Sequence, residues 1–474
     1  MKAIKLLLCP LLIVASWNEP SFGQVAGEKI YVVNNTELKS GPLTIGRVTA
    51  GNILTIEDVR GGWYQVHHKA VAARGWIPRQ DALAVQAAFD QFTQTIQTRP
   101  TAFAYVGRAL IWKDRGEIAQ ALSDLDAAVA VEPQNAFAFH TRGVLWMKQH
   151  QWSRSIPDFD ETLRLSFDPI VQSSAHHNRG IAWMRLKEFD KAIPDFDACI
   201  RLSSLNQADA FANRGEARNF RRGNLDLALA DLTEALRQNP KHEKAWSMRA
   251  TNYELRGDWD QALADFSQAL LLDPKNVAAI DNRGCIWEKK GDLDQALSDF
   301  SAAIQLDPKF APPFGDRARV LEYKGEIERA EADLNEFVRL SENQDRVLAL
   351  VLRASFYARQ ESVARASTDI NAALATVDHM KAEPLTKLAF FLATCPKVEL
   401  RNGPVAVELA GKACEATRFS NPEMLDVLAA AYAASGDFDQ AVQTEKRALA
   451  LSDDTTQKLA FEEKISRYAN NELR

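Results

Sequence analysis

The segment from Asn282 to Phe300, NRGCIWEKKGDLDQALSDF, gathers side chains that could carry out a reaction. It holds an arginine, a cysteine, a lysine pair and two acidic pairs within a few turns of chain. A nucleophile beside acid and base groups is what an active site needs. The same residue types also serve as packing and ion-pair residues of a scaffold. An active site is normally a single constellation, so the number of copies of this pattern distinguishes the two interpretations.

The pattern returns along most of the chain. Ala250, Gly284 and Ala318 are each 34 residues apart, and similar segments lie at 105–133 and 178–200. Each copy has a small residue, an aromatic residue three positions later, a glycine turn, and then alanine, phenylalanine and proline at fixed offsets. In the copy that contains the opening segment, these are Gly284, Trp287, Gly291, Ala296, Phe300, Ala303 and Pro308.

This signature resembles the tetratricopeptide repeat (TPR) family. The resemblance implies a mainly α fold, a right-handed α-solenoid of about ten helix pairs over residues 101–454. The repeats start near residues 102, 136, 173, 208, 243, 277, 311, 347, 382 and 422. Residues 84–100 look like an N-terminal capping helix, and residues 455–474 like a C-terminal one that closes the array.

Arginine and aspartate recur in step through the first eight repeats. A residue used once per repeat serves something that every unit needs, so we interpret this set as structural. We expect each arginine to form a partly buried pair with an aspartate of its own or a neighbouring repeat, which fixes helix packing. The alternative is a basic ladder that binds an acidic ligand. The set comprises Arg108, Arg142, Arg179, Arg214, Arg249, Arg283, Arg317, Arg353, Asp124, Asp158, Asp195, Asp231, Asp265, Asp299, Asp333 and Asp369.

The first helices of TPR proteins line a concave groove, and the resemblance places a polar lining there. The lining is mixed in sign and lacks a long apolar stripe, which suits an extended peptide or a protein flank. A solvated face without a ligand is the alternative for each residue. The candidate groove residues are Lys113, His140, Lys148, His177, Arg185, Glu216, Lys244, Glu254, Asp281, Glu288, Arg319, Glu322 and Arg359.

A short-period region precedes the helices. Residues 29–33, 52–56 and 63–66 are rich in β-branched and aromatic residues, and glycines punctuate them, which predicts short strands. Residues 26–83 resemble the bacterial SH3 (SH3b) family, through the Gly51 turn, the Trp63 strand and the closing Gly75-Trp76-Ile77. The resemblance implies a small all-β barrel that binds cell-wall peptides or protein segments. Trp63 and Trp76 are candidates for its ligand face, and the alternative is that they belong to its core.

The first residues are typical of a signal peptide. Lys2 and Lys5 precede an apolar run over residues 6–15, and small residues suit cleavage after Gly23. We therefore expect residues 1–23 to be removed and the protein to be exported, periplasmic or secreted, with no transmembrane span in the mature chain. The net charge is −6, with no basic stripe that would neutralise phosphates, so nucleic acid is not expected as a partner.

The remaining chemistry-bearing residues form no familiar catalytic or metal motif. GxSxG, HExxH, P-loop and paired His/Cys spacings are lacking, so we expect no enzyme activity, no metal and no cofactor. Cys395 and Cys414 lie on the two helices of the ninth repeat, where either a disulfide or two buried thiols is compatible with the sequence. The sequence thus favours an exported scaffold for protein or peptide partners. The alternative is a peptidoglycan-binding module with the repeats as spacer.

Overall fold

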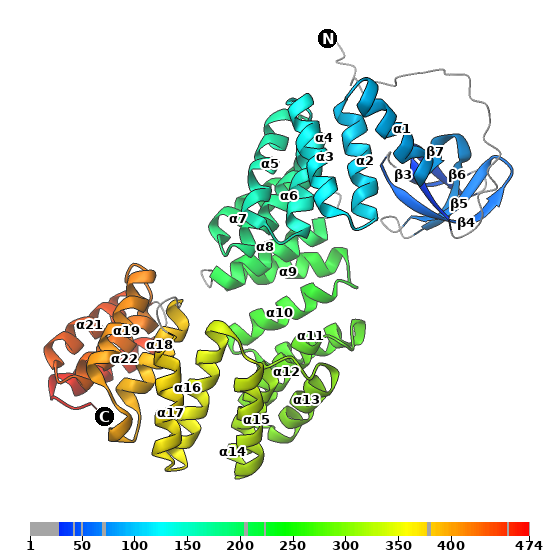
Figure 1. Cartoon of the computed structure of the whole chain (residues 1–474). Helices are drawn as coiled ribbons and strands as arrows, with labels where there is room; N and C mark the ends of the chain where they lie inside the picture. Colours follow the sequence, from blue (N-terminus) through cyan, green and yellow to red (C-terminus); the bar gives the residue numbers. More distant parts are fainter. Residues whose placement is uncertain are drawn as a thin grey trace. The chain divides into compact units, whose positions relative to one another are not determined.

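A computed structural model describes residues 28–40, 43–48, 51–68, 73–202, 207–221, 224–376, 381–452 and 455–473. The expected signal peptide, residues 1–23, lies outside these ranges. The chain divides into two compact units, residues 1–221 and 222–474 (Figure 1). The predicted fold class is confirmed, because a β-sheet precedes a long series of paired helices in both sequence and structure.

The first unit begins with a seven-stranded antiparallel sheet. Its strand order is β3-β2-β6-β5-β4-β1-β7. Alternate residues such as Ile30, Leu54, Tyr64, Val66 and Ile77 point into a buried core, as the period of two along a strand requires. The strands are β1 (Lys29–Val32), β2 (Thr36–Ser40), β3 (Leu43–Val48), β4 (Ile53–Arg60), β5 (Trp63–His68), β6 (Ala73–Pro78) and β7 (Ala82–Ala84).

The sheet continues directly into the helices. Strand β7 ends at Ala84 and helix α1 (Val85–Thr98) begins at the next residue. Tyr31 of β1 packs edge-to-face on Phe92 of α1, with ring centroids 5.3 Å apart, and Lys29 pairs with Asp114 at 2.8 Å. The sheet and the first helices therefore share a small apolar core and form one packed body.

The six helices that follow α1 in the first unit form three antiparallel pairs, and the seventh packs on the last of these pairs. Each pair packs first helix against second, and each second helix packs on the next first helix. The elements are α2 (Ala102–Asp114), α3 (Ile118–Val131), α4 (Ala136–Lys148), α5 (Trp152–Leu165), α6 (Pro169–Arg185), α7 (Phe189–Leu202) and α8 (Gln207–Arg221).

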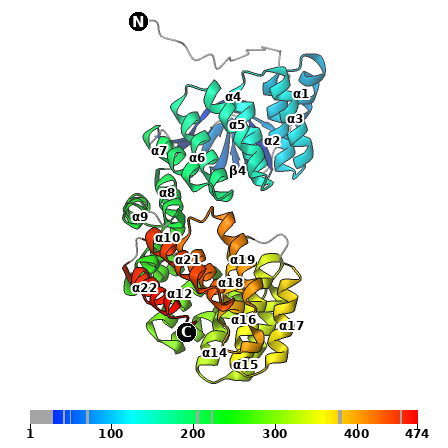
Figure 2. The same cartoon turned by 90° about the vertical axis from the view of Figure 1, so that its left-hand side faces the viewer.

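The second unit continues the pattern, and Figure 2 shows α14 to α17 stacked side by side. Helix α22 packs on the last pair, where a C-terminal capping helix was expected. The elements are α9 (Leu225–Gln238), α10 (Glu243–Arg256), α11 (Trp259–Leu272), α12 (Val277–Lys290), α13 (Leu293–Leu306), α14 (Pro312–Tyr323), α15 (Ile327–Leu340), α16 (Asn343–Arg359), α17 (Val363–Leu374), α18 (Ala382–Thr394), α19 (Gly403–Ala416), α20 (Pro422–Ala434), α21 (Phe438–Leu451) and α22 (Thr455–Ala469).

Small residues and turn residues explain why the helices pair so closely. Gly291 ends α12 with φ +82°, a left-handed conformation that lets the chain reverse within two residues. At Gly284, an added Cβ would lie 2.7 Å from the ring of Phe300, so the absence of a side chain lets the ring pack against the backbone of α12. The recurring small residue and aromatic anchor of the sequence are therefore the two sides of one contact.

The first helices line the inner side of the stack within each unit. Consecutive first helices touch one another, as α2 does α4 and α12 does α14. Over the part of the chain that the structure describes, consecutive second helices make no contact of comparable extent. Because the first helices converge and the second helices diverge, the first helices occupy the inside of the curve. We call the surface they present the inner face.

Candidate functional site

The arginines and aspartates that recur in the sequence are brought together as bidentate pairs. Arg283 Nε and Nη2 donate to the two carboxylate oxygens of Asp299 at 2.8 and 2.7 Å. Six further pairs have the same fork geometry, with donor–acceptor distances of 2.6 to 3.0 Å. They are Arg108–Asp124, Arg142–Asp158, Arg179–Asp195, Arg249–Asp265, Arg317–Asp333 and Arg353–Asp369.

These pairs lie inside the repeats. Each of the seven aspartates is at most 7% exposed. The hydrogen bonds from Arg283 to Asp299 raise the pKa of the guanidinium, which keeps it charged. A paired arginine whose fork is already filled has little left to offer an acidic ligand, so the geometry favours the packing interpretation.

The third nitrogen of the arginine reaches the preceding repeat. Arg317 Nη1 donates to Ser301 at 3.1 Å, and Arg353 Nη1 donates to Asn335 at 2.8 Å. Arg142 Nη1 donates to Asp126 in the same way, at 2.8 Å. One guanidinium therefore ties three helices together: its own first helix, the second helix of the same repeat and the second helix of the repeat before.

Arg214 and Asp231, the remaining members of the set, belong to different units of the chain. Arg214 lies in the first unit, where its Nη1 donates to Asp197 of the preceding repeat, and Asp231 lies in the second. The repeat that contains them is one residue longer between the two positions, 17 rather than 16.

Five of the six candidate groove residues of the first unit are lysine, arginine or histidine, and the sixth, Glu216, is acidic. Burial, and then the positive charge of the nearby Lys148, lowers the pKa of Lys113. His140 Nε2 lies 3.0 Å from Ser174 Oγ of α6, and burial lowers its pKa. His177 packs edge-to-face on Phe196, Arg185 lies over the ring of Trp152 and is exposed, and Glu216 is half-buried on α8.

The candidate groove residues of the second unit pair across neighbouring first helices. Glu254 accepts from Lys289 at 2.6 Å, Glu288 from Arg319 at 2.7 Å, and Glu322 from Arg359 at 2.8 Å. We call these three contacts the inner pairs. They join α10 to α12, α12 to α14 and α14 to α16, so the inner face is a continuous strip of alternating charge. Lys244 is half-buried on α10.

Asp281 is the exception within this strip. It is 6% exposed, and its Oδ1 has no hydrogen-bond partner among the described residues. Burial, and then the nearby Asp316, raise the pKa of Asp281 to about 7, although Arg319 acts in the opposite direction. A carboxyl group in this state is the most unusual ionisable group on the inner face.

Three residues near Asp281 were not recognised as a group in the sequence. Asp316 and Arg319 of α14 face it from the next repeat, and Cys285 lies one turn along α12. Burial, with the charges of Asp316 and Asp281, raises the pKa of the Cys285 thiol, so it is held as an unreactive thiol. The helical spacing of 281, 285 and 288 is visible in the sequence, but the burial of Asp281 is not.

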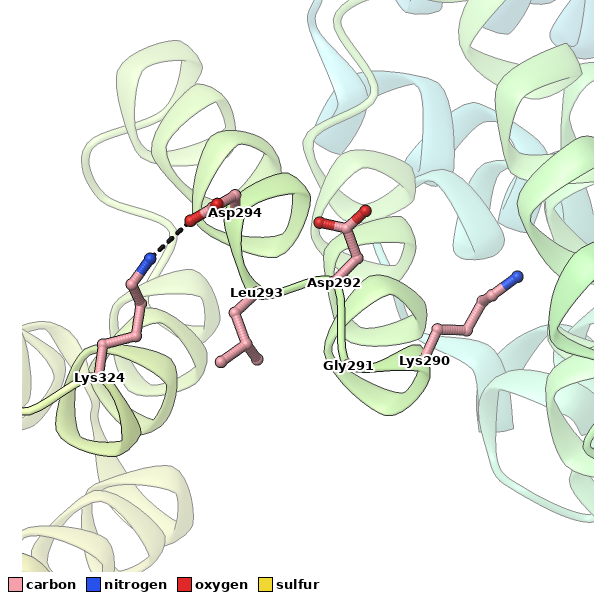
Figure 3. Close-up of a pocket in the computed structure, with 6 residues that line it drawn as sticks. All are labelled: Lys290, Gly291, Asp292, Leu293, Asp294 and Lys324. Carbon is pink, nitrogen blue, oxygen red and sulfur yellow. Dashed lines mark hydrogen bonds and ion pairs between the residues drawn. The ribbon is translucent and has the colours of Figure 1, made fainter.

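Another row of ion pairs lies at the ends of the first helices and also escaped the sequence reasoning. Lys324 Nζ donates to Asp294 at 2.5 Å, and Lys290 pairs with Asp260 in the repeat before. Figure 3 shows the shallow polar pocket at this corner, where Lys324 points to Asp294 and Lys290 points away from both. In each pair the lysine follows the aspartate by 30 residues, and this constant spacing was the signal in the sequence. Because the two ion pairs recur at equivalent positions of successive repeats, we interpret the pocket as part of the packing between repeats.

The tryptophans of the β-sheet lie on its outer face. Gln65 pairs in register with Trp76, and Trp63 lies two residues from Gln65, so both rings are on the face opposite Tyr64 and Ile77. Lys39 lies over Trp63 at 5.9 Å and Arg60 over Trp76 at 5.2 Å. Among the described residues, the buried core of the sheet contains Tyr64 and Ile77 but neither tryptophan.

Cys395 and Cys414 are free, buried thiols in this structure, so the disulfide that the sequence permits is not formed in it. Burial raises the pKa of Cys414 to about 11. Within the described residues, no cluster of histidine, cysteine and acidic side chains could hold a metal ion. Nor do those residues include a helix with the length and apolar character needed to span a bilayer.

Comparison with known proteins supports the repeats. Residues 243–276 and 277–310 match the tetratricopeptide repeat family model. A curated relative, bacteriophage adsorption protein A of Escherichia coli K12, is 29% identical over 123 residues, which are 26% of this chain and 12% of that protein. The chain thus matches about an eighth of the length of this relative.

Two solved structures are similar to this chain over much of its length. Yeast Tom70 covers 81% of this chain and 92% of its own, with 16% identity and a TM-score of 0.49. A tetratricopeptide repeat protein from Parabacteroides merdae covers 59% of this chain and 99% of its own, with 17% identity and a TM-score of 0.45.

Proposed function

We propose, from the tetratricopeptide repeats at residues 243–310 and the helix pairs on either side, that this chain is a non-enzymatic scaffold that holds protein partners together. The partners are extended peptides or protein flanks bound along the inner face. We further propose that the protein is exported, which the apolar run at residues 6–15 supports, and that the N-terminal sheet is an SH3-like second binding module.

The observation that carries this proposal is the continuous inner face of the second unit. Its side chains alternate in sign from α10 to α16 and are held in place by the inner pairs. Ordered charges at repeat spacing can hydrogen-bond an extended chain at many points without a deep pocket. The arginines and aspartates that resembled an active site are used in helix packing.

The scaffold function is tested by affinity purification of the tagged full-length chain from the cell that makes it, followed by mass spectrometry. The test variant carries Glu288→Lys and Glu322→Lys, which reverse two charges of the inner face. The control is Glu336→Lys on the second helix α15, where Glu336 pairs only locally with Arg339. We expect the inner-face variant to lose partners that the control retains. Identical partner sets from both variants would contradict the proposal.

The second candidate function is recognition of cell-wall peptides by the β-sheet. The exposed position of Trp63 beside Trp76, each with a cation over its ring, favours it, because such a pair offers apolar area and charge on one face. Co-sedimentation of the full-length chain with purified peptidoglycan tests this. We expect Trp63→Ala to reduce the bound fraction and Phe103→Ala, at an exposed aromatic on α2, to leave it unchanged. Equal sedimentation of all three proteins would remove this candidate.

A further inference from the structure

Five side chains of α12 and α14 form one cluster on the inner face of the second unit. They are Asp281, Cys285, Glu288, Asp316 and Arg319. Positions 281, 285 and 288 recur at helical spacing, so they share the side of α12 that faces α14. Arg319 of α14 donates to two of these carboxylates, from Nη2 to Glu288 at 2.7 Å and from Nη1 to Asp316 at 2.7 Å.

The charges of this cluster do not balance. Three carboxyl groups face one guanidinium. The guanidinium of Arg319 pairs with two of them, those of Glu288 and Asp316. Asp281 is left over, 6% exposed, with Oδ1 unpartnered among the described residues. A buried acceptor without a donor costs folding free energy, and a buried carboxylate without a cation costs more. Asp281 is therefore the member of the cluster that lacks a cation of its own with hydrogen-bond donors.

Among the described residues, no cation besides Arg319 is recorded as acting on Asp281. Burial and Asp316 raise the pKa of Asp281 to about 7, and Arg319 is the only positive group that acts against them. Near neutral pH a substantial fraction of the chains thus carries Asp281 protonated. A cation brought to this position would favour the ionised form and gain an ion pair in a site already shielded from water.

We propose that Asp281, Glu288 and Asp316 form an acidic subsite that takes the ammonium or guanidinium group of a lysine or arginine side chain in the bound peptide. This proposal rests on the proposed function, because the peptide is the one that the inner face holds. Arg319, whose side chain is 43% exposed, holds Glu288 and Asp316 and must move to admit the peptide side chain. The subsite sets which residue the peptide must present between α12 and α14.

The test starts with selection of a phage-displayed random peptide library on the immobilised full-length chain. We expect enriched peptides with a lysine or arginine at one fixed position. A synthetic copy of an enriched peptide is then titrated calorimetrically against the wild-type chain, beside the same peptide with norleucine in place of that lysine or arginine. We expect the norleucine peptide to bind roughly 30-fold more weakly, as for loss of one partner of a buried charge pair.

The protein side of the cycle uses Asp281→Asn. It should weaken the cationic peptide by a similar factor, leave the norleucine peptide unchanged, and keep the wild-type melting temperature or raise it. The matched control is Asp439→Asn on α21, an exposed aspartate far along the chain from the cluster. Enriched peptides without a basic residue, or equal binding of the two peptides by wild type, would overturn the subsite but leave the scaffold function standing. No enrichment of any peptide would overturn the peptide-binding function and the subsite with it.

Discussion

All three nitrogens of the Arg283 guanidinium donate hydrogen bonds. Two of them donate to Asp299, and the third donates to Ser267 of the preceding repeat at 3.5 Å. A buried ion pair of this kind contributes little net stability, because desolvation offsets the attraction. Removal of one partner destabilises the fold strongly, because the other charge stays buried without compensation. The value of the pair lies in the register it imposes on three helices.

Arg283→Met tests this at the residue scale. We expect it to lower the free energy of unfolding by about 3 kcal/mol, because Asp299 is left buried without a partner. The double variant Arg283→Met with Asp299→Leu should recover most of that loss. Chemical denaturation of the four proteins of this cycle measures the coupling. Unchanged stability of the single variant, with loss of partner binding, would show that the arginines serve a ligand.

Asp281 gives a pH-dependent prediction with a definite sign. Its pKa in the folded chain is about 7, above the ordinary value of 3.8, so the folded state binds the proton more tightly than the unfolded state does. The contribution of Asp281 to stability should therefore fall as pH rises from 3.8 to about 7 and then level off. Asp281→Asn removes this dependence, so its advantage over wild type should grow across the same range, to at most about 4 kcal/mol. Denaturation midpoints below and above this range measure it, and a constant difference would contradict the assignment.

Residues differ in how far the sequence reveals them. The arginine–aspartate set was visible because it recurs in the first eight repeats, which made its spacing measurable without a structure. Asp281 occurs once, and its unusual state depends on burial and on Asp316 and Arg319 one repeat away. Nothing in the local sequence distinguishes it from Glu288, which is paired.

At the scale of elements, the contact between Gly284 and Phe300 sets how closely α12 and α13 approach. Gly284→Ala should destabilise the chain by about 1–3 kcal/mol, because the new Cβ would stand 2.7 Å from the ring. Adding Phe300→Leu should restore much of the loss, since the next repeat has Ala318 and Leu334 at these positions.

Gly411→Ala is the matched control for that substitution. Gly411 lies within α19, and a Cβ there would meet nothing within 4 Å. The change should raise the free energy of unfolding by about 0.5–1 kcal/mol, because alanine loses less chain entropy in a helix. Thermal melts of both variants decide the matter. A loss at Gly411 as large as that at Gly284 would mean that packing against Phe300 is not the cause.

The helices were predictable as elements because a period of 34 residues specifies both members of each pair and the turn between them. The packing of Tyr31 on Phe92 was not predictable in this way. Two apolar residues more than 60 positions apart reveal their contact only when the sheet and the helices are both folded. For the same reason the outward position of Trp63 and Trp76 follows from strand register, which composition does not fix.

At the scale of the whole array, a solenoid needs a cap on its last repeat. The tenth repeat has Glu445 at the position of apolar anchors such as Phe300, Leu334 and Ile370, and burial together with Asp426 raises the pKa of Glu445. Helix α22 covers this position with Lys464, which pairs with Asp426, and with the buried rings of Phe461 and Tyr468. Glu445 is therefore part of the contact between the last repeat and the capping helix α22.

Phe461→Ala tests the capping role. The side chain is 5% exposed, so its loss should cost about 3 kcal/mol and promote self-association through the uncovered end. Leu459→Ala on the same helix removes a side chain that is 63% exposed and should change stability little. Circular dichroism melts and size-exclusion chromatography report the two effects. Equal behaviour of the two variants would show that α22 is dispensable.

The central claim is that partners bind on the inner face of the repeats. Hydrogen–deuterium exchange of the full-length chain, with and without a peptide selected from the random library, tests it most directly. We predict added protection in the first helices α10, α12, α14 and α16, with the second helices α11, α13 and α15 unchanged. Protection confined to the second helices, or to the β-sheet, would contradict the account.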